Sequence, residues 1–253
     1  MKKRNNYVGI DISKLTFDVA ICNSESKYKY FKFSNNNEGF VLFLELLNDS
    51  ESICVMEASG PYYLKLATFL SEQGISVCVI NPLVIRRFSQ MRMSRAKTDK
   101  KDAMLIAEYG KTEKPNLWLP EADYVLELKQ MQAYLEQLNK SRTGLIRQNE
   151  AFKQNPNQSL QVANSIESIL EKIELEINVI EKNMELLIQT HHKEMFNHLQ
   201  SIPGLGKKTS LFLIVISGGF SKFENHKQLA SYIGISPRIF ESGTSVKGRS
   251  KIC

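Results

Sequence analysis

The chain has 253 residues, of which 42% are hydrophobic and 24% are charged, proportions typical of a soluble globular protein. No apolar run approaches the roughly 18 residues that a membrane-spanning helix needs. The basic start MKKRNN is not followed by the apolar stretch of a signal peptide. We therefore expect a cytoplasmic protein without a membrane segment. The four cysteines are widely separated, which indicates reduced thiols and no disulfides.

The net charge of +6 is concentrated in two segments. Residues 86–101 contain seven Lys or Arg against one acid, and residues 207–253 contain eight against two. Residues 121–200 are instead acidic, with twelve acids against eight bases. Two basic segments are expected for a protein that binds a polyanion such as nucleic acid. A solvated, lysine-rich surface explains the charge alone equally well.

Short β-branched and aromatic runs alternate with helical patterns in the first part of the chain. The expected elements are strands at 7–13, 16–24 and 27–35, a helix at 38–49, a strand at 52–59, a helix beginning near Pro61 and a strand at 75–82. Closely spaced strands favour an antiparallel meander, and a strand, helix and strand in succession favour a parallel pair. This order predicts an α/β fold with a ribonuclease H-like mixed sheet.

The middle of the chain has a different pattern. Apolar residues recur every three or four positions on both sides of the break QNPNQS at 154–159, which predicts an antiparallel helical hairpin or coiled coil. Such a hairpin would space two domains or pair with another subunit, and a plain helical bundle is the alternative. We expect three domains: an acidic catalytic domain at 1–115, a helical linker at 116–198 and a mainly helical C-terminal domain at 199–253.

The C-terminal segment begins with SIPGLGKKTS, a glycine-containing turn that leads into a helix. It is similar to the hairpin of helix-hairpin-helix modules, in which glycines let the backbone approach a phosphate at a helix N-terminus. A tight turn before a buried helix explains the same residues.

Four acidic residues occupy positions that this fold would bring together. Asp11 ends the first strand and Glu57 ends the fourth, and these strands are neighbours in a ribonuclease H-like sheet. Asp99 and Asp102 are one turn apart on a helix. Four carboxylates held together repel one another unless a cation neutralises them, and hard oxygen ligands suit Mg²⁺ or Mn²⁺. Each acid by itself is explained equally well as a cap of a turn or helix.

Several ordered motifs resemble one known family. GIDISK, MEASGPYYLKLATFL, KTDKKDAMLIAEY and the run beginning IPGLGKKTSLFLIVISGG are similar to the DEDD transposases of bacterial insertion sequences, which are related to the Piv DNA invertase. The resemblance implies a RuvC-like N-terminal domain in which Asp11, Glu57, Asp99 and Asp102 bind the metal. It implies a transposase domain in which Ser242, in FESGTSVKG, attacks DNA and forms a covalent intermediate, with Ser245 as the nearby alternative.

The resemblance also implies partners. These are the DNA of the element ends and target, a structured guide RNA and a homo-oligomer, either a dimer or a tetramer. The residues expected to contact nucleic acid are Arg95, Lys97, Lys100, Lys101, Gly204, Gly206, Lys207, Lys208, Lys247 and Arg249. Family members normally continue past SKI, so we expect a shortened C-terminal domain.

Two other functions remain open from the residues. A metal-dependent nuclease or junction resolvase would use only the acidic site. A non-catalytic nucleic-acid-binding protein would use only the basic segments.

Overall fold

The structure is a computed structural model that describes residues 6–22, 27–47, 52–93 and 98–237, and the backbone of residues 241–242 and 246–247. The chain divides into two compact units, Met1–Pro120 and Glu121–Cys253. Within the described residues, no helix has the length and apolar character needed to cross a membrane. Cys22, Cys54 and Cys78 are free thiols, and Cys253 lies outside the described residues.

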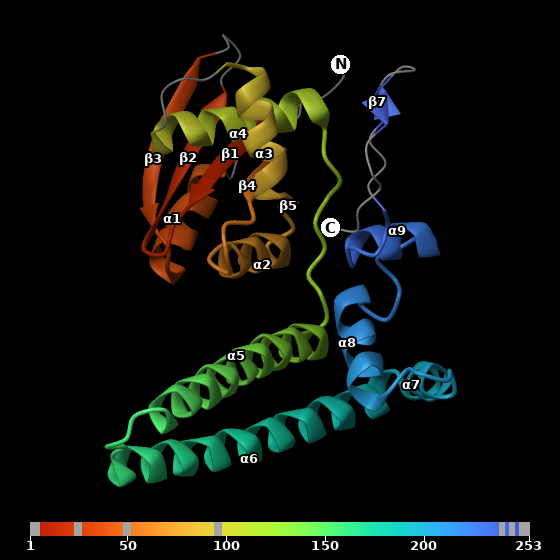
Figure 1. Ribbon diagram of the computed structural model, residues 1–253. Helices are drawn as coiled ribbons and strands as arrows, with labels where there is room; N and C mark the ends of the chain where they lie inside the picture. Colours follow the sequence, from red (N-terminus) through yellow and green to blue (C-terminus); the bar gives the residue numbers. More distant parts are fainter. Residues whose placement is uncertain are drawn as a thin grey trace. The chain divides into compact units, whose positions relative to one another are not determined.

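The first unit is built on a five-stranded sheet (Figure 1). Its strands are β1 (Asn6–Ile12), β2 (Thr16–Cys22), β3 (Tyr28–Ser34), β4 (Ser52–Glu57) and β5 (Ser76–Ile80). The order across the sheet is β3-β2-β1-β4-β5. The first three strands pair antiparallel, and β4 and β5 continue the sheet in parallel. This topology confirms the predicted mixed sheet of ribonuclease H-like type.

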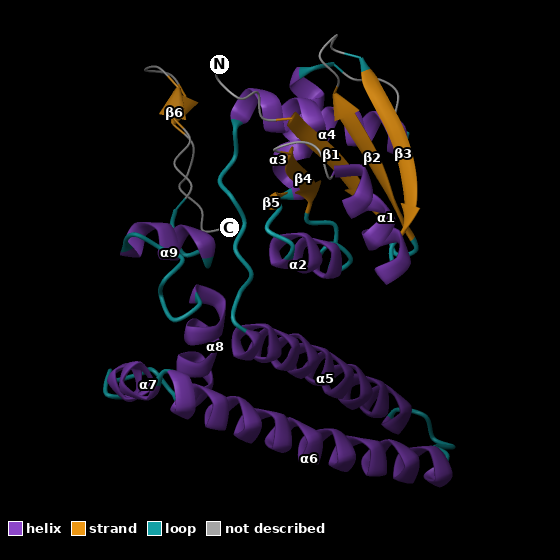
Figure 2. Cartoon of the chain, turned by 180° about the vertical axis from the view of Figure 1, so that it is seen from behind, coloured by secondary structure: helices purple, strands orange, loops and turns teal. Residues whose placement is uncertain are grey.

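Four helices cover the two faces of this sheet (Figure 2). They are α1 (Asn37–Leu47), α2 (Leu64–Glu72), α3 (Pro82–Met91) and α4 (Asp99–Glu113). One face packs on α1 and α2 through an apolar core that includes Ile10, Phe17 and Met56. The other face packs on α3 and α4 through a smaller core that includes Val55 and Ile106. The acidic residues lie on this second face, as described below.

Two local expectations differ from the structure. Pro61 lies in a turn and its carbonyl accepts a hydrogen bond from the Leu64 amide at 3.2 Å, so α2 begins three residues later than predicted. Helix α3 was not predicted, because the strand was expected to continue to residue 82. Asn81 instead caps α3, since its side chain accepts from the Leu83 amide at 2.8 Å and Pro82 occupies the first turn.

Helix α4 lies directly on the backbone of β1. A Cβ atom on Gly9 would come within 2.0 Å of the Ala103 carbonyl oxygen and 2.3 Å of the Ala107 nitrogen. Likewise, a Cβ atom on Gly110 would lie 2.6 Å from a methyl carbon of Val55. Glycine at both positions therefore lets the helix approach more closely than any side chain would allow.

The second unit begins with two long helices, α5 (Asp123–Lys153) and α6 (Leu160–His191), which form the predicted antiparallel hairpin (Figure 1). Helices α7 (Lys193–Gln200), α8 (Lys207–Ser217) and α9 (His226–Tyr232) follow, and β6 (Glu241–Ser242) pairs antiparallel with β7 (Val246–Lys247). One core joins α5, α6, α7 and α8, and its largest side chains include Leu128, Met184 and Phe196. The expected domain boundaries at 116 and 199 stay a prediction.

We predict that Gly9→Ala lowers the free energy of unfolding by about 1–3 kcal/mol, as overpacking typically does, because the added methyl group collides with the backbone of α4. Equilibrium denaturation in urea measures this. Gly144→Ala is the matched control, since nothing lies within 4 Å of its Cβ position in α5 and alanine favours a helix. A Gly9→Ala protein as stable as the wild type would contradict the prediction.

Candidate active site

Asp11 and Glu57 lie side by side at the ends of two adjacent strands. Ile10 of β1 is paired with Met56 of β4, and Asp11 and Glu57 are the next residue on each strand. Ile10 and Met56 point into the core beneath α1 and α2. Because side chains alternate along a strand, Asp11 and Glu57 project from the opposite face, which α4 covers.

Asp99 and Asp102 lie in the first turn of α4. Thr98 caps this helix, since its hydroxyl accepts from the Lys101 amide at 3.3 Å. The free amides and the dipole at a helix N-terminus stabilise negative charge in this turn. Contact of Gly9 with Ala103 and Ala107 then places the turn that carries both acids over the end of β1.

The pKa of Asp11 shows that these acids share one electrostatic environment. Burial is the largest cause that raises the pKa of Asp11 from 3.8 to about 6, and the negative charges of Asp102, Asp99, Glu57 and Asp18 contribute to the same rise, in that order of effect. The charge of each of the other three predicted acids therefore acts on Asp11. Their side chains are not equally buried, because Asp99 is 68% exposed.

The donor set fits a hard divalent cation, since carboxylate oxygens are the ligands that Mg²⁺ and Mn²⁺ prefer and added positive charge would relieve the repulsion at Asp11. Within the ranges that the structure describes, no three acidic, histidine or cysteine side chains already form a ligating group. The carboxylates would have to turn inward to bind an ion.

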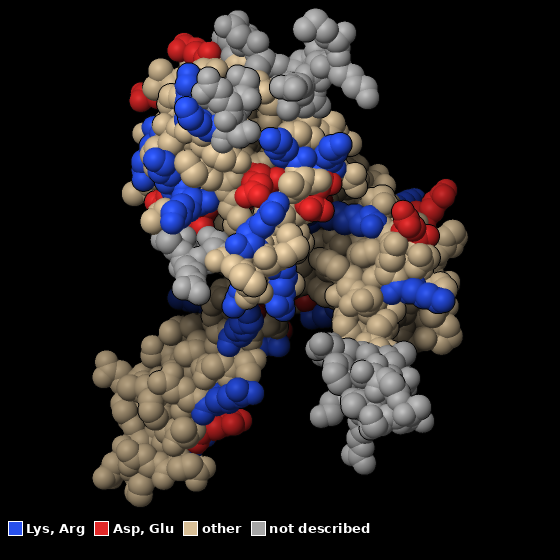
Figure 3. Space-filling view, turned by 90° about the horizontal axis from the view of Figure 1, so that it is seen from above, with Lys and Arg blue, Asp and Glu red and all other residues tan. Residues whose placement is uncertain are grey.

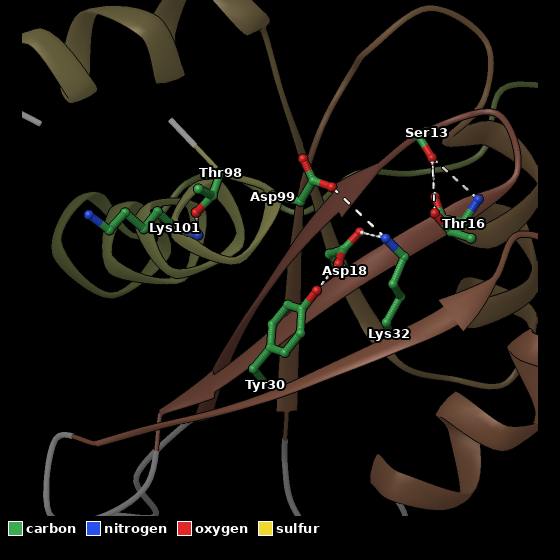
Figure 4. Close-up of polar contacts among 8 residues, drawn as sticks. All are labelled: Ser13, Thr16, Asp18, Tyr30, Lys32, Thr98, Asp99 and Lys101. Atoms are coloured by element: carbon green, nitrogen blue, oxygen red, sulfur yellow. Dashed lines mark hydrogen bonds and ion pairs between the residues drawn. The ribbon is translucent and has the colours of Figure 1, made fainter. Parts of the chain in front are cut away.

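Sequence reasoning missed Asp18 of β2. It is the cross-strand partner of Asp11 and is buried, with 3% of its surface exposed. Lys32 of β3 lies between two acids, with its Nζ 3.6 Å from Asp18 Oδ2 and 3.9 Å from Asp99 Oδ2 (Figure 4). The signal available in the sequence was a charged residue in the middle of an otherwise apolar strand, TFDVAIC.

The residues expected to contact nucleic acid fall into four groups: those on α4, those at the turn before α8, Lys247 in β7, and those outside the described residues. Lys100 and Lys101 are exposed on α4, and the Lys100 ammonium lies 5.6 Å from the centre of the Tyr30 ring. Figure 3 shows Lys and Arg side chains spread over one face of the molecule, with smaller groups of acids between them. Arg95, Lys97 and Arg249 lie outside the described residues.

The glycine turn before α8 forms as expected, but its lysines have partners. Gly204 has a φ of +90°, which favours glycine, and Gly206 is the N-cap of α8. The Lys207 ammonium pairs with Glu185, and that of Lys208 lies 2.6 Å from Glu181. These ion pairs connect α8 to α6, so a phosphate would have to compete with them.

Ser242 and Lys247 lie in the short hairpin of β6 and β7. Ser242 is paired with Val246, and Lys247 with Glu241. The structure describes only the backbone at these positions, and Ser245 lies outside the described residues.

The first unit is thus a ribonuclease H-like domain with acids at the ends of its first and fourth strands and two more on a covering helix. Comparison with sequence families gives the particular family. A family model described as "Transposase", of the DEDD type of IS110, matches residues 8–152. A second, described as "Transposase IS116/IS110/IS902 family", matches residues 196–253. The chain belongs to this transposase family, as its motifs predicted.

Similar proteins agree with this assignment. The chain is 34% identical over 257 residues to the pilin gene-inverting protein of Moraxella lacunata, covering 97% of this chain and 76% of that protein. It is 24% identical over 267 residues to the transposase for insertion sequence element IS1111A of Coxiella burnetii, covering 93% and 70%. The Thermus thermophilus RuvC structure superposes with a TM-score of 0.33 and 13% identity, over 45% of this chain and 99% of that one. The fold assignment rests on the sheet order and not on this superposition.

We predict that Asp11→Asn stabilises the metal-free protein at pH 7.5 and not at pH 3.5. The raised pKa means that the folded state holds a proton on Asp11 more tightly than the unfolded state does. Stability is thus lost as the pH rises from about 4 to about 6, and asparagine removes this loss. The gain should be about 1–2 kcal/mol, because Asp11 remains partly exposed to solvent. Thermal denaturation in a chelator at both pH values measures it, and a destabilised variant at pH 7.5 would contradict it.

Proposed function

We propose that this protein cleaves and rejoins DNA phosphodiester bonds at the ends of an insertion sequence and at its target. Asp11, Glu57, Asp99 and Asp102 hold Mg²⁺ or Mn²⁺, and Ser242 is the nucleophile. The observation that carries the proposal is the position of Asp11 and Glu57, side by side on the sheet face that is covered by α4, the helix with Asp99 and Asp102 in its first turn. The names of the two relatives, a gene-inverting protein and a transposase, support DNA rearrangement as the reaction.

The proposed chemistry divides between the metal and the chain. Divalent ions held by carboxylates activate an attacking oxygen and stabilise a leaving one in phosphodiester chemistry. The Ser242 hydroxyl loses its proton and attacks phosphorus, which links the serine to one DNA end and releases the other end as a hydroxyl. Attack by a DNA hydroxyl on that linkage rejoins the strand and restores the serine. Lys247 and Arg249 balance the charge that develops on the phosphate oxygens.

The proposed partners are DNA, a structured guide RNA and further copies of the chain, acting in the cytoplasm. The exposed basic residues of α4, Lys100 and Lys101, would hold the nucleic-acid backbone beside the acids. The hairpin of α5 and α6 supports a dimer or tetramer, because Leu175, Val179 and Leu186 of α6 are 67%, 52% and 57% exposed. Apolar side chains that recur along one helix are typical of a surface that another helix covers.

We predict that Asp102→Asn lowers the rate of DNA cleavage by about a hundredfold or more, since loss of a metal ligand removes several kcal/mol of transition-state stabilisation. The assay uses element-end DNA, the flanking RNA and Mg²⁺.

In the wild type, Mn²⁺ should also raise the melting temperature, because an ion that binds only the folded state stabilises it. This rise should disappear in Asp102→Asn and persist in Asp123→Asn, a matched change in the first turn of α5. Mn²⁺ uptake that does not depend on the acidic residues, with the same rise in melting temperature in Asp102→Asn as in the wild type, would favour a non-catalytic nucleic-acid-binding protein.

We predict that Ser242→Ala abolishes the covalent protein–DNA adduct and strand rejoining. Mass spectrometry of the trapped adduct identifies the linked residue. An adduct at Ser245 would overturn the assignment of Ser242. Undiminished cleavage by Ser242→Ala without any adduct would instead support the metal-dependent nuclease, which needs only the acidic residues.

A further inference from the structure

Asp18 is a buried carboxylate that none of the proposed chemistry uses. Its cross-strand partners are Asp11 on β1 and Lys32 on β3, so three charged residues lie in one row across the sheet. Residues paired across strands project from the same face, and here that is the face under α4. Asp18 therefore lies beside Asp11 on the sheet, outside the first turn of α4 that carries Asp99 and Asp102.

The two oxygens of Asp18 have separate partners (Figure 4). The Tyr30 hydroxyl donates a hydrogen bond to Oδ1, and the Lys32 ammonium pairs with Oδ2 at 3.6 Å. The hydrogen bond to Asp18 is the largest cause that raises the pKa of Tyr30 to about 12, with burial and the nearby negative charges adding to the rise, so the tyrosine stays a donor. A buried carboxylate is strongly destabilising unless it has such partners. Asp18 thus holds the ammonium of Lys32 at this point on the sheet.

Lys32 also reaches α4. Its Nζ lies 3.9 Å from Asp99 Oδ2, and Lys100 of the same helical turn lies over the Tyr30 ring. The side chain of Asp99 is 68% exposed, so packing does not fix its direction. The ion pair with Lys32 links the Asp99 carboxylate to β3, on the sheet face that also carries Asp11 on β1.

We propose that Lys32, anchored by Asp18 and Tyr30, is a positioning residue that holds Asp99 and the first turn of α4 in place for the metal. This inference rests on the proposed function in assigning Asp99 as a metal ligand. Partners that orient metal ligands typically change metal affinity about 10–100-fold when they are removed. Lys32 itself contacts no metal and no reacting atom in this proposal.

The test compares Lys32→Met with Lys29→Met in the full chain. Lys29 is an exposed lysine of the same strand whose side chain projects from the opposite face, so the change of charge is matched. Mn²⁺ affinity is measured by calorimetry without DNA. We expect Lys32→Met to weaken Mn²⁺ binding about tenfold, Lys32→Arg to restore it and Lys29→Met to leave it unchanged. Tyr30→Phe, which removes only the hydroxyl, should weaken it less than Lys32→Met.

The direction in which Lys32→Met changes the Mn²⁺ affinity decides between two roles for Lys32. If Lys32 were only a nearby positive charge, removing it would lower the repulsion felt by Mn²⁺ and tighten binding. Tighter or unchanged binding in Lys32→Met would therefore overturn the proposal. A double-mutant cycle adds a second test: in an Asp99→Asn background, Lys32→Met should cause no further loss, because the residue it positions is gone.

Hydrogen exchange separates this inference from the proposed function. In metal-free protein, amides 102–105 of α4 should exchange faster in Lys32→Met than in Lys29→Met, whether or not the protein binds metal. Faster exchange together with a wild type that takes up no Mn²⁺ would refute the metal site and still support the role of Lys32 in holding the first turn of α4. Equal exchange in the two variants would refute this role of Lys32 even if the wild type binds Mn²⁺.

Discussion

The arrangement of the first unit depends on the direct contact between α4 and β1. Because Gly9 has no side chain, the backbone of the helix rests on the backbone of the strand, with Ala103 and Ala107 at the contact. A larger residue would move the helix outward and take Asp102 with it. Because protein interiors are close-packed and have low compressibility, this contact fixes the distance between the two elements. The position of the acids is thus set by residues that have no charge.

Charge repulsion is the cost of this arrangement. The sheet and the helix hold Asp11 close to other carboxylates, and burial together with these negative charges raises its pKa to about 6. Lys32 offsets part of this negative charge at the outer side of the site, where it pairs with Asp18 and Asp99. Among the described residues, no ion pair offsets the charge of Asp11 itself. The negative charge at this end of the sheet is therefore only partly compensated within the described residues.

The sequence predicted the sheet and the helical hairpin, because hydrophobic periodicity is a local signal. It also predicted the strand ends that carry Asp11 and Glu57, and the metal site at the four acids stays a prediction. It did not reveal Asp18, since the register that places this residue beside Asp11 and Lys32 is set by packing across strands. The pairing of Lys208 with Glu181 was missed for a similar reason. Which face of α6 meets α8 follows from the core between them and not from either helix alone. Helix α3 was overlooked although Asn81 and Pro82 form a local start signal.

The order of the elements along the chain has a consequence for biosynthesis. β1 leaves the ribosome first. Helix α4, which carries Asp99 and Asp102, is the last helix or strand of the first unit, which ends at Pro120. Contacts between distant parts of the sequence form late, because closing a long loop has an entropic cost. A nascent or prematurely terminated chain that lacks α4 would carry Asp11 and Glu57 without the other two acids. The two pairs of acids therefore come together only after the whole of the first unit has been synthesised.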